Sequence, residues 1–133
     1  MSTALRILII ENHEATAAFI SLYLQRLGHE VVVASNGQAA LDRNDLAGFD
    51  AILSDIGLPD VNGWDLMKQL RPITGAFAIA MSGFGGEADV QRSLAAGYQY
   101  HLVKPFVPSA LEDALRNVNS ERQGRAPTRP KIG

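Results

Sequence analysis

Short apolar runs alternate with longer amphipathic segments along most of this chain, and this alternation limits its fold more than any other feature. Residues 5–10 are apolar at all but one position, which is typical of a strand buried on both faces. Shorter apolar runs predict four more strands, at residues 31–33, 51–53, 77–81 and 100–103. A segment that carries helix signals follows each run, so five helices are expected.

Turn and capping residues indicate where these helices begin and end. Asn12 or His13 is expected to open the first helix, which runs to about Leu27. The second helix is expected to follow the turn at residues 35–37 and to reach about Ala47. Three more are expected: one ending at Leu70, one ending before Gly97, and one with apolar residues at 111, 115 and 118.

Strands that alternate with helices predict an α/β fold, a doubly wound parallel sheet of five strands with five helices on its two faces. Two strand orders are common in such sheets, and we adopt the order 2-1-3-4-5. The 133 residues suit a single domain, placed at residues 1–121. Glycine and proline collect after that point, so residues 122–133 are expected to form a flexible tail or linker.

Composition excludes several classes of protein. The chain has no cysteine, which rules out disulfides, thiolate zinc sites and a cysteine nucleophile. Its 12 basic and 14 acidic residues give a formal charge of −2, which argues against direct nucleic-acid binding. The apolar runs are strand-sized, far below the roughly 20 residues of a membrane span, and the start does not resemble a signal peptide. A cytoplasmic domain without a membrane partner is therefore expected.

Polar residues follow four of the five expected strands. They are Glu11 and Asn12 after the first strand, Asp55 after the third, Ser82 after the fourth and Lys104 after the fifth. Ligands of open α/β sheets bind beyond the carboxyl ends of the strands. We therefore expect these five side chains to converge in one crevice.

This set of side chains suits phosphoryl transfer. Two carboxylates near 4 Å repel each other by about 4 kcal/mol at an effective dielectric near 20, so Lys104 and a divalent cation are needed to offset them. Mg²⁺ accepts carboxylate oxygens and often bridges to phosphate. Asp55 can then attack phosphorus and form an acyl phosphate, while Ser82 and Lys104 hold the phosphoryl oxygens.

Five sequence motifs lie at or beside the expected strand ends, in this order: Arg6-Ile7-Leu8-Ile9-Ile10-Glu11, Ala34-Ser35-Asn36-Gly37-Gln38, Asp55-Ile56-Gly57-Leu58-Pro59-Asp60-Val61-Asn62-Gly63, Met81-Ser82-Gly83 and His101-Leu102-Val103-Lys104-Pro105-Phe106. Together they resemble the motifs of a known family, the receiver domain of a two-component response regulator. The resemblance covers residues 5–118, nearly the whole chain. The motifs that contain Ser82 and Lys104 are most similar to those of receivers carried by hybrid sensor kinases.

The resemblance implies a flavodoxin-like receiver fold and a phosphorelay function. Asp55 would accept the phosphoryl group from a histidine kinase or a histidine phosphotransfer protein. Ser82 and Lys104 would contact that group, and the backbone carbonyl of Gly57 would be a metal ligand. The Lys104–Pro105 peptide bond would be cis. His101 occupies the position of the family's switch aromatic; the alternative is an ordinary half-exposed histidine at a strand end.

The chain departs from the family at Asn12, where a second acid is usual. Glu11, Asn12, Asp55 and Gly57 would hold Mg²⁺ or Mn²⁺, but losing one charge near the metal costs about 1–4 kcal/mol, so weak binding is expected. Asn12 could instead cap the first helix, or do both. Trp64 is expected to pack in the interior, and His13 and His29 to lie at the surface.

Three functions are therefore open. The leading one is a switch that is controlled by phosphate and is not an enzyme beyond self-phosphorylation and self-dephosphorylation. It would act on a downstream protein through the surface of the fourth helix, the fifth strand and the fifth helix. A phosphate-independent interaction module is favoured only by Asn12. A flavodoxin-like cofactor binder or hydrolase would need a phosphate-cradling glycine loop after the first strand, and residues 11–14 are not one.

Overall fold

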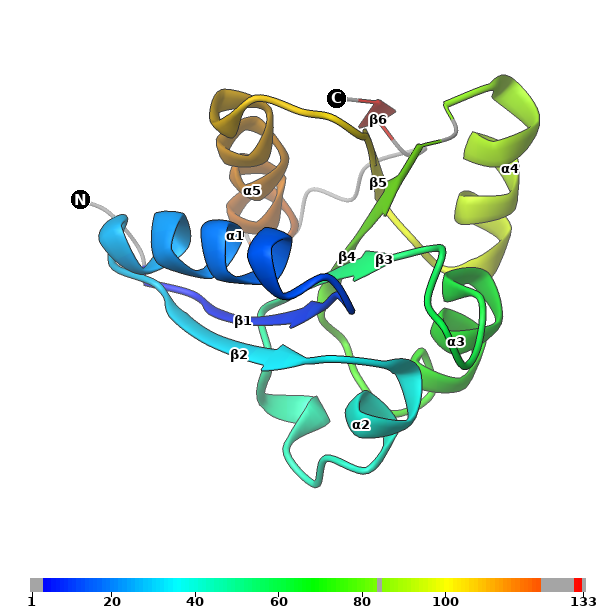
Figure 1. Cartoon of the computed structure of the whole chain (residues 1–133), viewed down its shortest axis with the longest axis horizontal. Coiled ribbons are helices and arrows are strands. Elements are labelled where there is room, and N and C mark those ends of the chain that lie inside the picture. Colours follow the sequence, from blue (N-terminus) through cyan, green and yellow to red (C-terminus); the bar gives the residue numbers. More distant parts are fainter. Residues whose placement is uncertain (1–3, 84, 123–130, 133) are drawn as a thin grey trace.

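The computed structural model describes residues 4–83, 85–122 and 131–132, and its centre is a parallel sheet (Figure 1). The strand order is β2-β1-β3-β4-β5-β6, so the predicted order of the first five strands is confirmed. The strands are β1 (Arg6–Ile10), β2 (Glu30–Ala34), β3 (Ala51–Asp55), β4 (Phe77–Ser82), β5 (Tyr100–Val103) and β6 (Lys131–Ile132).

Helices cover both faces of the sheet. They are α1 (Glu14–Arg26), α2 (Gly37–Leu41), α3 (Gly63–Leu70), α4 (Glu87–Ala96) and α5 (Pro108–Arg122), with a 3₁₀ turn, η1 (Leu46–Gly48). α1 and α5 lie on one face, and α2, α3 and α4 lie on the other. No helix in the described ranges is long and apolar enough to cross a membrane.

Each apolar run forms a strand because its alternate side chains fill both cores. In β1, Ile7 and Ile9 pack with residues of α1 and α5, while Leu8 and Ile10 pack with the opposite helices. All four side chains are fully buried. β3 is likewise buried at every position. The carboxyl ends of these strands therefore open onto a common edge of the molecule, with a rigid core beneath them.

The second helix is shorter than the sequence predicted. α2 ends at Leu41 rather than near Ala47, and the chain continues irregularly to η1. Asp45 provides the physical reason, because its carboxylate accepts hydrogen bonds from Arg43 and from Arg6 of β1, at 2.8 and 2.6 Å. These ion pairs hold residues 43–45 against the sheet in a non-helical conformation.

A sixth strand was not predicted. Lys131 and Ile132 pair in parallel with Tyr100 and His101 at the β5 edge of the sheet. Most of the segment expected to be a flexible tail or linker, residues 123–130 and 133, lies outside the described residues.

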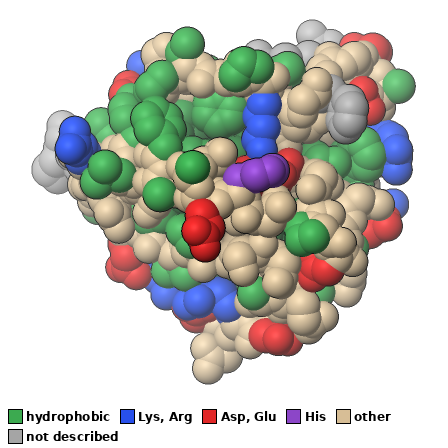
Figure 2. Space-filling view, in the orientation of Figure 1, with side chains coloured by type: hydrophobic (Ala, Val, Ile, Leu, Met, Phe, Trp, Pro, Cys, Tyr) green, Lys and Arg blue, Asp and Glu red, His purple; other side chains and the backbone are tan. Residues whose placement is uncertain are grey.

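Hydrophobic side chains also lie at the surface, and on the face seen in Figure 2 they are densest in the upper left part of the view. The most exposed are Phe19 and Leu22 on α1, at 57% and 52%, and Val107 just before α5, at 63%. Both helices begin close after a strand that ends at the common edge.

Gly63 is where α3 begins, and it lies against the backbone at the end of β3. A Cβ atom at this position would lie 2.7 Å from the carbonyl oxygen of Asp55 and 2.7 Å from the Cα of Ile56. Only glycine allows this approach, so the contact fixes α3 relative to Asp55.

We expect Gly63→Ala to lower the free energy of unfolding by about 1–3 kcal/mol, because backbone atoms must move apart to admit the methyl group. Gly75→Ala is the control, since nothing lies within 4 Å of a Cβ at that position. Urea unfolding of both variants measures the difference. Equal unfolding free energies would show that α3 moves away at little cost.

Candidate functional site

Three predicted side chains, those of Glu11, Asp55 and Lys104, meet at the carboxyl ends of the central strands, and Ser82 ends the neighbouring strand β4. Glu11 directly follows β1, Asp55 and Ser82 end β3 and β4, and Lys104 directly follows β5. The Lys104 Nζ lies 2.8 Å from Glu11 Oε1 and 3.5 Å from Asp55 Oδ2. Glu11 is 1% exposed and Asp55 is 6% exposed, so this ammonium offsets part of the charge of two carboxylates that have lost most of their water.

The protonation of Glu11 is set by two opposing effects. Burial raises the pKa of the Glu11 carboxyl, but hydrogen bonds from Lys104 and His13 lower it, and the net pKa lies below the usual range. The carboxylate uses both oxygens. Oε1 binds Lys104, while Oε2 accepts the backbone N–H of His13 at 3.2 Å. Glu11 is therefore ionised at neutral pH.

Asp55 is held by the loop that follows it. Its Oδ1 accepts the backbone N–H of Gly57 at 3.1 Å, which leaves Oδ2 toward Lys104. Gly57 forms a bridge with Asn62, which closes the loop, and the Asn62 side chain caps α3 by accepting the N–H of Asp65 at 2.9 Å. The side chain of the expected phosphoacceptor therefore has one oxygen engaged by backbone and one facing a cation.

Asn12 is not the cap of α1. The residue in the N-cap position is His13, whose side chain makes no capping hydrogen bond. The Asn12 Oδ1 is buried and has no hydrogen-bond partner within the described part of the chain. A buried oxygen without a partner, on the residue that follows Glu11, suits a cation ligand, because with the Glu11 and Asp55 carboxylates it would give the oxygen-rich donor set that Mg²⁺ prefers. The residues present fit the expected metal.

Ser82 and His101 lie on the side of the pocket toward α4. Ser82 is buried, and its carbonyl accepts the N–H of Lys104 at 2.7 Å. His101 is fully buried, so the alternative of a half-exposed histidine is wrong. Its Nδ1 lies 2.9 Å from the Ser93 Oγ on α4. The Lys104–Pro105 bond is cis, as the resemblance implied.

Trp64 packs in the interior, as expected, but it also completes a polar chain. Its Nε1–H donates to Ser93 Oγ at 3.0 Å, so one hydroxyl joins Trp64 of α3 to His101 of β5. The Arg92 guanidinium covers the Trp64 ring, 3.7 Å from its centroid. Nothing in the sequence around Ser93 indicated this contact, because it depends on how α4 packs over β5.

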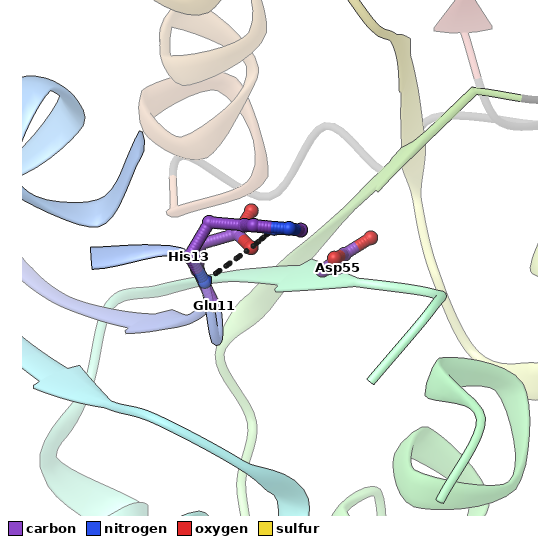
Figure 3. A group of neighbouring side chains, drawn as sticks. All are labelled: Glu11, His13 and Asp55. Atoms are coloured by element: carbon purple, nitrogen blue, oxygen red, sulfur yellow. Dashed lines mark hydrogen bonds and ion pairs between the residues drawn. The ribbon is translucent and has the colours of Figure 1, made fainter. Parts of the chain in front are cut away.

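His13 is exposed, as predicted, yet it belongs to the pocket. Its Nδ1 lies 3.3 Å from Glu11 Oε2. Glu11, His13 and Asp55 each offer one ligand atom, and these atoms lie within 4.8 Å of one another (Figure 3). The spacing of two residues from Glu11 was a signal for this contact that sequence reasoning passed over.

Comparison with known proteins agrees with this geometry. The family described as the response regulator receiver domain matches residues 7–116. Sensory transduction protein RegX3 of Mycobacterium bovis is 33% identical over 112 residues, which are 84% of this chain and 49% of that protein. Virulence sensor protein BvgS of Bordetella bronchiseptica is 33% identical over 137 residues, 96% of this chain and 11% of that protein.

Solved structures show the same fold. Chemotaxis response regulator CheY4 of Vibrio cholerae superposes with a TM-score of 0.77 at 27% identity, over 87% of this chain and 99% of that one. The chain spans about half the length of RegX3 and a ninth of BvgS.

Receiver domains in general are switches rather than enzymes. They bind Mg²⁺ at an acidic pocket, and they interact with histidine kinases or phosphotransfer proteins and with downstream effectors. With the fold, the strand-end residues and these matches in agreement, the chain belongs to the response regulator receiver domain family of two-component signalling.

Proposed function

We propose that this chain accepts a phosphoryl group on Asp55 from the phosphohistidine of a histidine kinase or phosphotransfer protein, and that it thereby switches a protein-interaction surface. One observation carries the proposal. The Lys104 ammonium contacts the carboxylates of both Glu11 and Asp55 at the strand ends, and the Asp55 side chain keeps 9% of its surface exposed.

Asp55 Oδ2 is the oxygen that attacks phosphorus in this proposal, because Oδ1 already accepts the Gly57 N–H. The new O–P bond forms as the N–P bond of the phosphohistidine breaks, and the released imidazole keeps the bonding electron pair. Lys104, 3.5 Å from Oδ2, then contacts a phosphoryl oxygen, and the Ser82 hydroxyl donates to another.

A divalent cation, Mg²⁺ or Mn²⁺, would be held by the Glu11 and Asp55 carboxylates, the Asn12 amide oxygen and the Gly57 carbonyl. When bound, it supplies charge neutralisation for the transferring group. We expect weak binding of this cation, because the pocket offers it only two carboxylates and Lys104 already contacts both of them. The buried, unpaired Asn12 Oδ1 supports its role as a ligand.

The switch would run from Ser82 to α4. Movement of the Ser82 side chain toward phosphate would displace the loop before α4, and the Ser93–His101 contact lies directly beneath that helix. The surface formed by α4, β5 and α5 would then change for a downstream protein. His101 is a switch residue in this proposal.

Exposed apolar side chains on α1 and before α5 offer contact area for the phosphodonor protein, since both helices begin at this end of the sheet. Catalysis by the chain would be limited to its own phosphorylation and dephosphorylation. A cytoplasmic location, the likeness to hybrid sensor kinase receivers and the two classes of protein partner stay predictions.

Phosphorylation itself is tested by incubating the chain with acetyl phosphate and Mg²⁺ and measuring its intact mass. We expect one added phosphoryl group on the wild-type chain and none on Asp55→Asn, because the amide lacks the nucleophilic oxygen. Asp42→Asn, which alters an exposed carboxylate on another element, should behave as wild type. An unchanged wild-type mass would instead favour a phosphate-independent interaction module.

The single tryptophan reports on the switch. We expect phosphorylation to change Trp64 emission, because the Trp64 indole is bonded to Ser93 of α4. Asp55→Asn should abolish the change, and Ser82→Ala should take up phosphate but reduce the change. A full change in phosphorylated Ser82→Ala would show that Ser82 does not transmit the signal.

Lys104→Met should destabilise the chain by roughly 1–3 kcal/mol at pH 7, because it leaves buried carboxylates without their cation. The pKa of Glu11 is depressed in the folded chain, so Glu11 contributes stability that is present above its unfolded pKa, about 4.3, and is lost as the pH falls below it.

The destabilisation by Lys104→Met should therefore shrink between pH 7 and pH 4. Without Lys104, burial raises the pKa of Glu11, so the variant protonates Glu11 in this range and no longer needs the ammonium. Urea unfolding at both pH values measures this. Lys104→Arg, which keeps the charge, is the control. A destabilisation that stays constant with pH would mean that Lys104 acts through packing alone.

A further inference from the structure

A histidine lies at the mouth of the acidic pocket, where the sequence predicted only oxygen ligands. His13 Nδ1, a Glu11 oxygen and an Asp55 oxygen lie within 4.8 Å of one another. Figure 3 shows the His13 ring extending from the residue before α1 toward Asp55. The pocket thus offers one nitrogen in addition to its carboxylates.

We propose that His13 is a metal ligand of this pocket and gives it a preference for a borderline transition-metal ion, Zn²⁺ or Co²⁺, over Mg²⁺. The inference rests on the proposed function only in that both use the same pocket. It assigns a role to a residue that the phosphoryl-transfer proposal does not use.

The two oxygens of the Glu11 carboxylate face different groups, and this leaves one of them for the metal ion. Oε1 is bound by Lys104 at 2.8 Å, whereas Oε2 faces His13 Nδ1 at 3.3 Å. Two ligand atoms that bind one metal ion at about 2.1 Å lie about 3.0–3.4 Å apart. The Oε2–Nδ1 pair therefore already has the spacing that a shared metal ion requires.

Only a small movement is needed to bring the Asp55 oxygen to the spacing of ligands that share one metal ion. The largest separation in the group, at most 4.8 Å, exceeds that spacing by roughly 1.5 Å. The His13 side chain is 70% exposed, so its ring can rotate without displacing packed atoms. Asn12 Oδ1, buried and without a partner in the described chain, is available as a fourth ligand.

The chemistry of the ligands decides which ion is favoured. Mg²⁺ takes oxygen ligands almost exclusively, whereas imidazole suits Zn²⁺ and other later first-row metals, which also bind mixed nitrogen and oxygen sites more tightly. Two carboxylates and Lys104 give the pocket a formal charge of only −1, which favours Mg²⁺ little. A neutral imidazole therefore adds affinity mainly for the transition-metal ion.

Calorimetric titration of the whole chain with Zn²⁺ and with Mg²⁺, without any phosphodonor, tests the inference. We expect the wild-type chain to bind Zn²⁺ at least about tenfold more tightly than Mg²⁺. We expect His13→Ala to lose about tenfold or more of its Zn²⁺ affinity and to change its Mg²⁺ affinity by less than about twofold. Visible absorption of bound Co²⁺ should change between wild type and His13→Ala.

His29→Gln is the control for Zn²⁺ binding to a histidine outside the pocket. The sequence predicted His29 at the surface, but it is half-buried and its Nδ1 accepts the N–H of Leu5 at 3.0 Å, so this variant should keep wild-type Zn²⁺ affinity. Tighter binding of Mg²⁺ than of Zn²⁺ would overturn the inference. Equal losses of both metals in His13→Ala, or the same Zn²⁺ loss in His29→Gln, would also overturn it. Retained Zn²⁺ affinity in His13→Ala would do the same.

The two proposals fail separately. A chain that takes up phosphate on Asp55 with Mg²⁺ but shows no His13-dependent Zn²⁺ affinity refutes only the role of His13. A chain that binds Zn²⁺ through His13 but gains no phosphoryl mass refutes only the proposed phosphoryl transfer.

Discussion

The contact of Lys104 with Glu11 and Asp55 is the interaction on which the pocket depends. Two buried carboxylates in one crevice repel each other by a few kcal/mol unless a positive charge lies beside them. Lys104 provides that charge, because β5 ends next to β4 and the lysine directly follows β5. The same ammonium that stabilises the resting pocket is positioned for a phosphoryl oxygen once Asp55 Oδ2 is occupied.

The fold and the centre of the site could be predicted because they follow from strong, local signals. A run such as residues 5–10 can bury both faces only in the middle of a helix-covered sheet, so β1 and its neighbours were placed correctly. Parallel strands end at one edge, so residues that follow them must meet. For that reason the sequence predicts that Glu11, Asp55 and Lys104 lie together, and their side chains are in contact in the structure.

The features that the sequence did not predict depend on contacts between segments that are distant in the chain, and local sequence patterns do not encode such contacts. α2 stops early because Asp45 binds Arg6 across 39 residues. His101 is buried because Ser93 and Trp64 come from two different helices to meet it. Asn12 is a residue type that often caps helices, but α1 begins two residues later, at Glu14. His13 was read as a surface residue, which is true of its exposure but not of its contacts.

The close approach of Gly63 to the carbonyl of Asp55 makes the two sides of the pocket different, because the helix on each side is joined to the site in a different way. On one side, α3 is joined to the acceptor by backbone contact and offers no tolerance even for a methyl group. On the other, the side chain of Ser93 on α4 contacts His101 of β5. Substitutions on the outer surface of α4 could thus diversify what the domain recognises without disturbing acceptor geometry. Chemistry and specificity would then be able to evolve as separate traits.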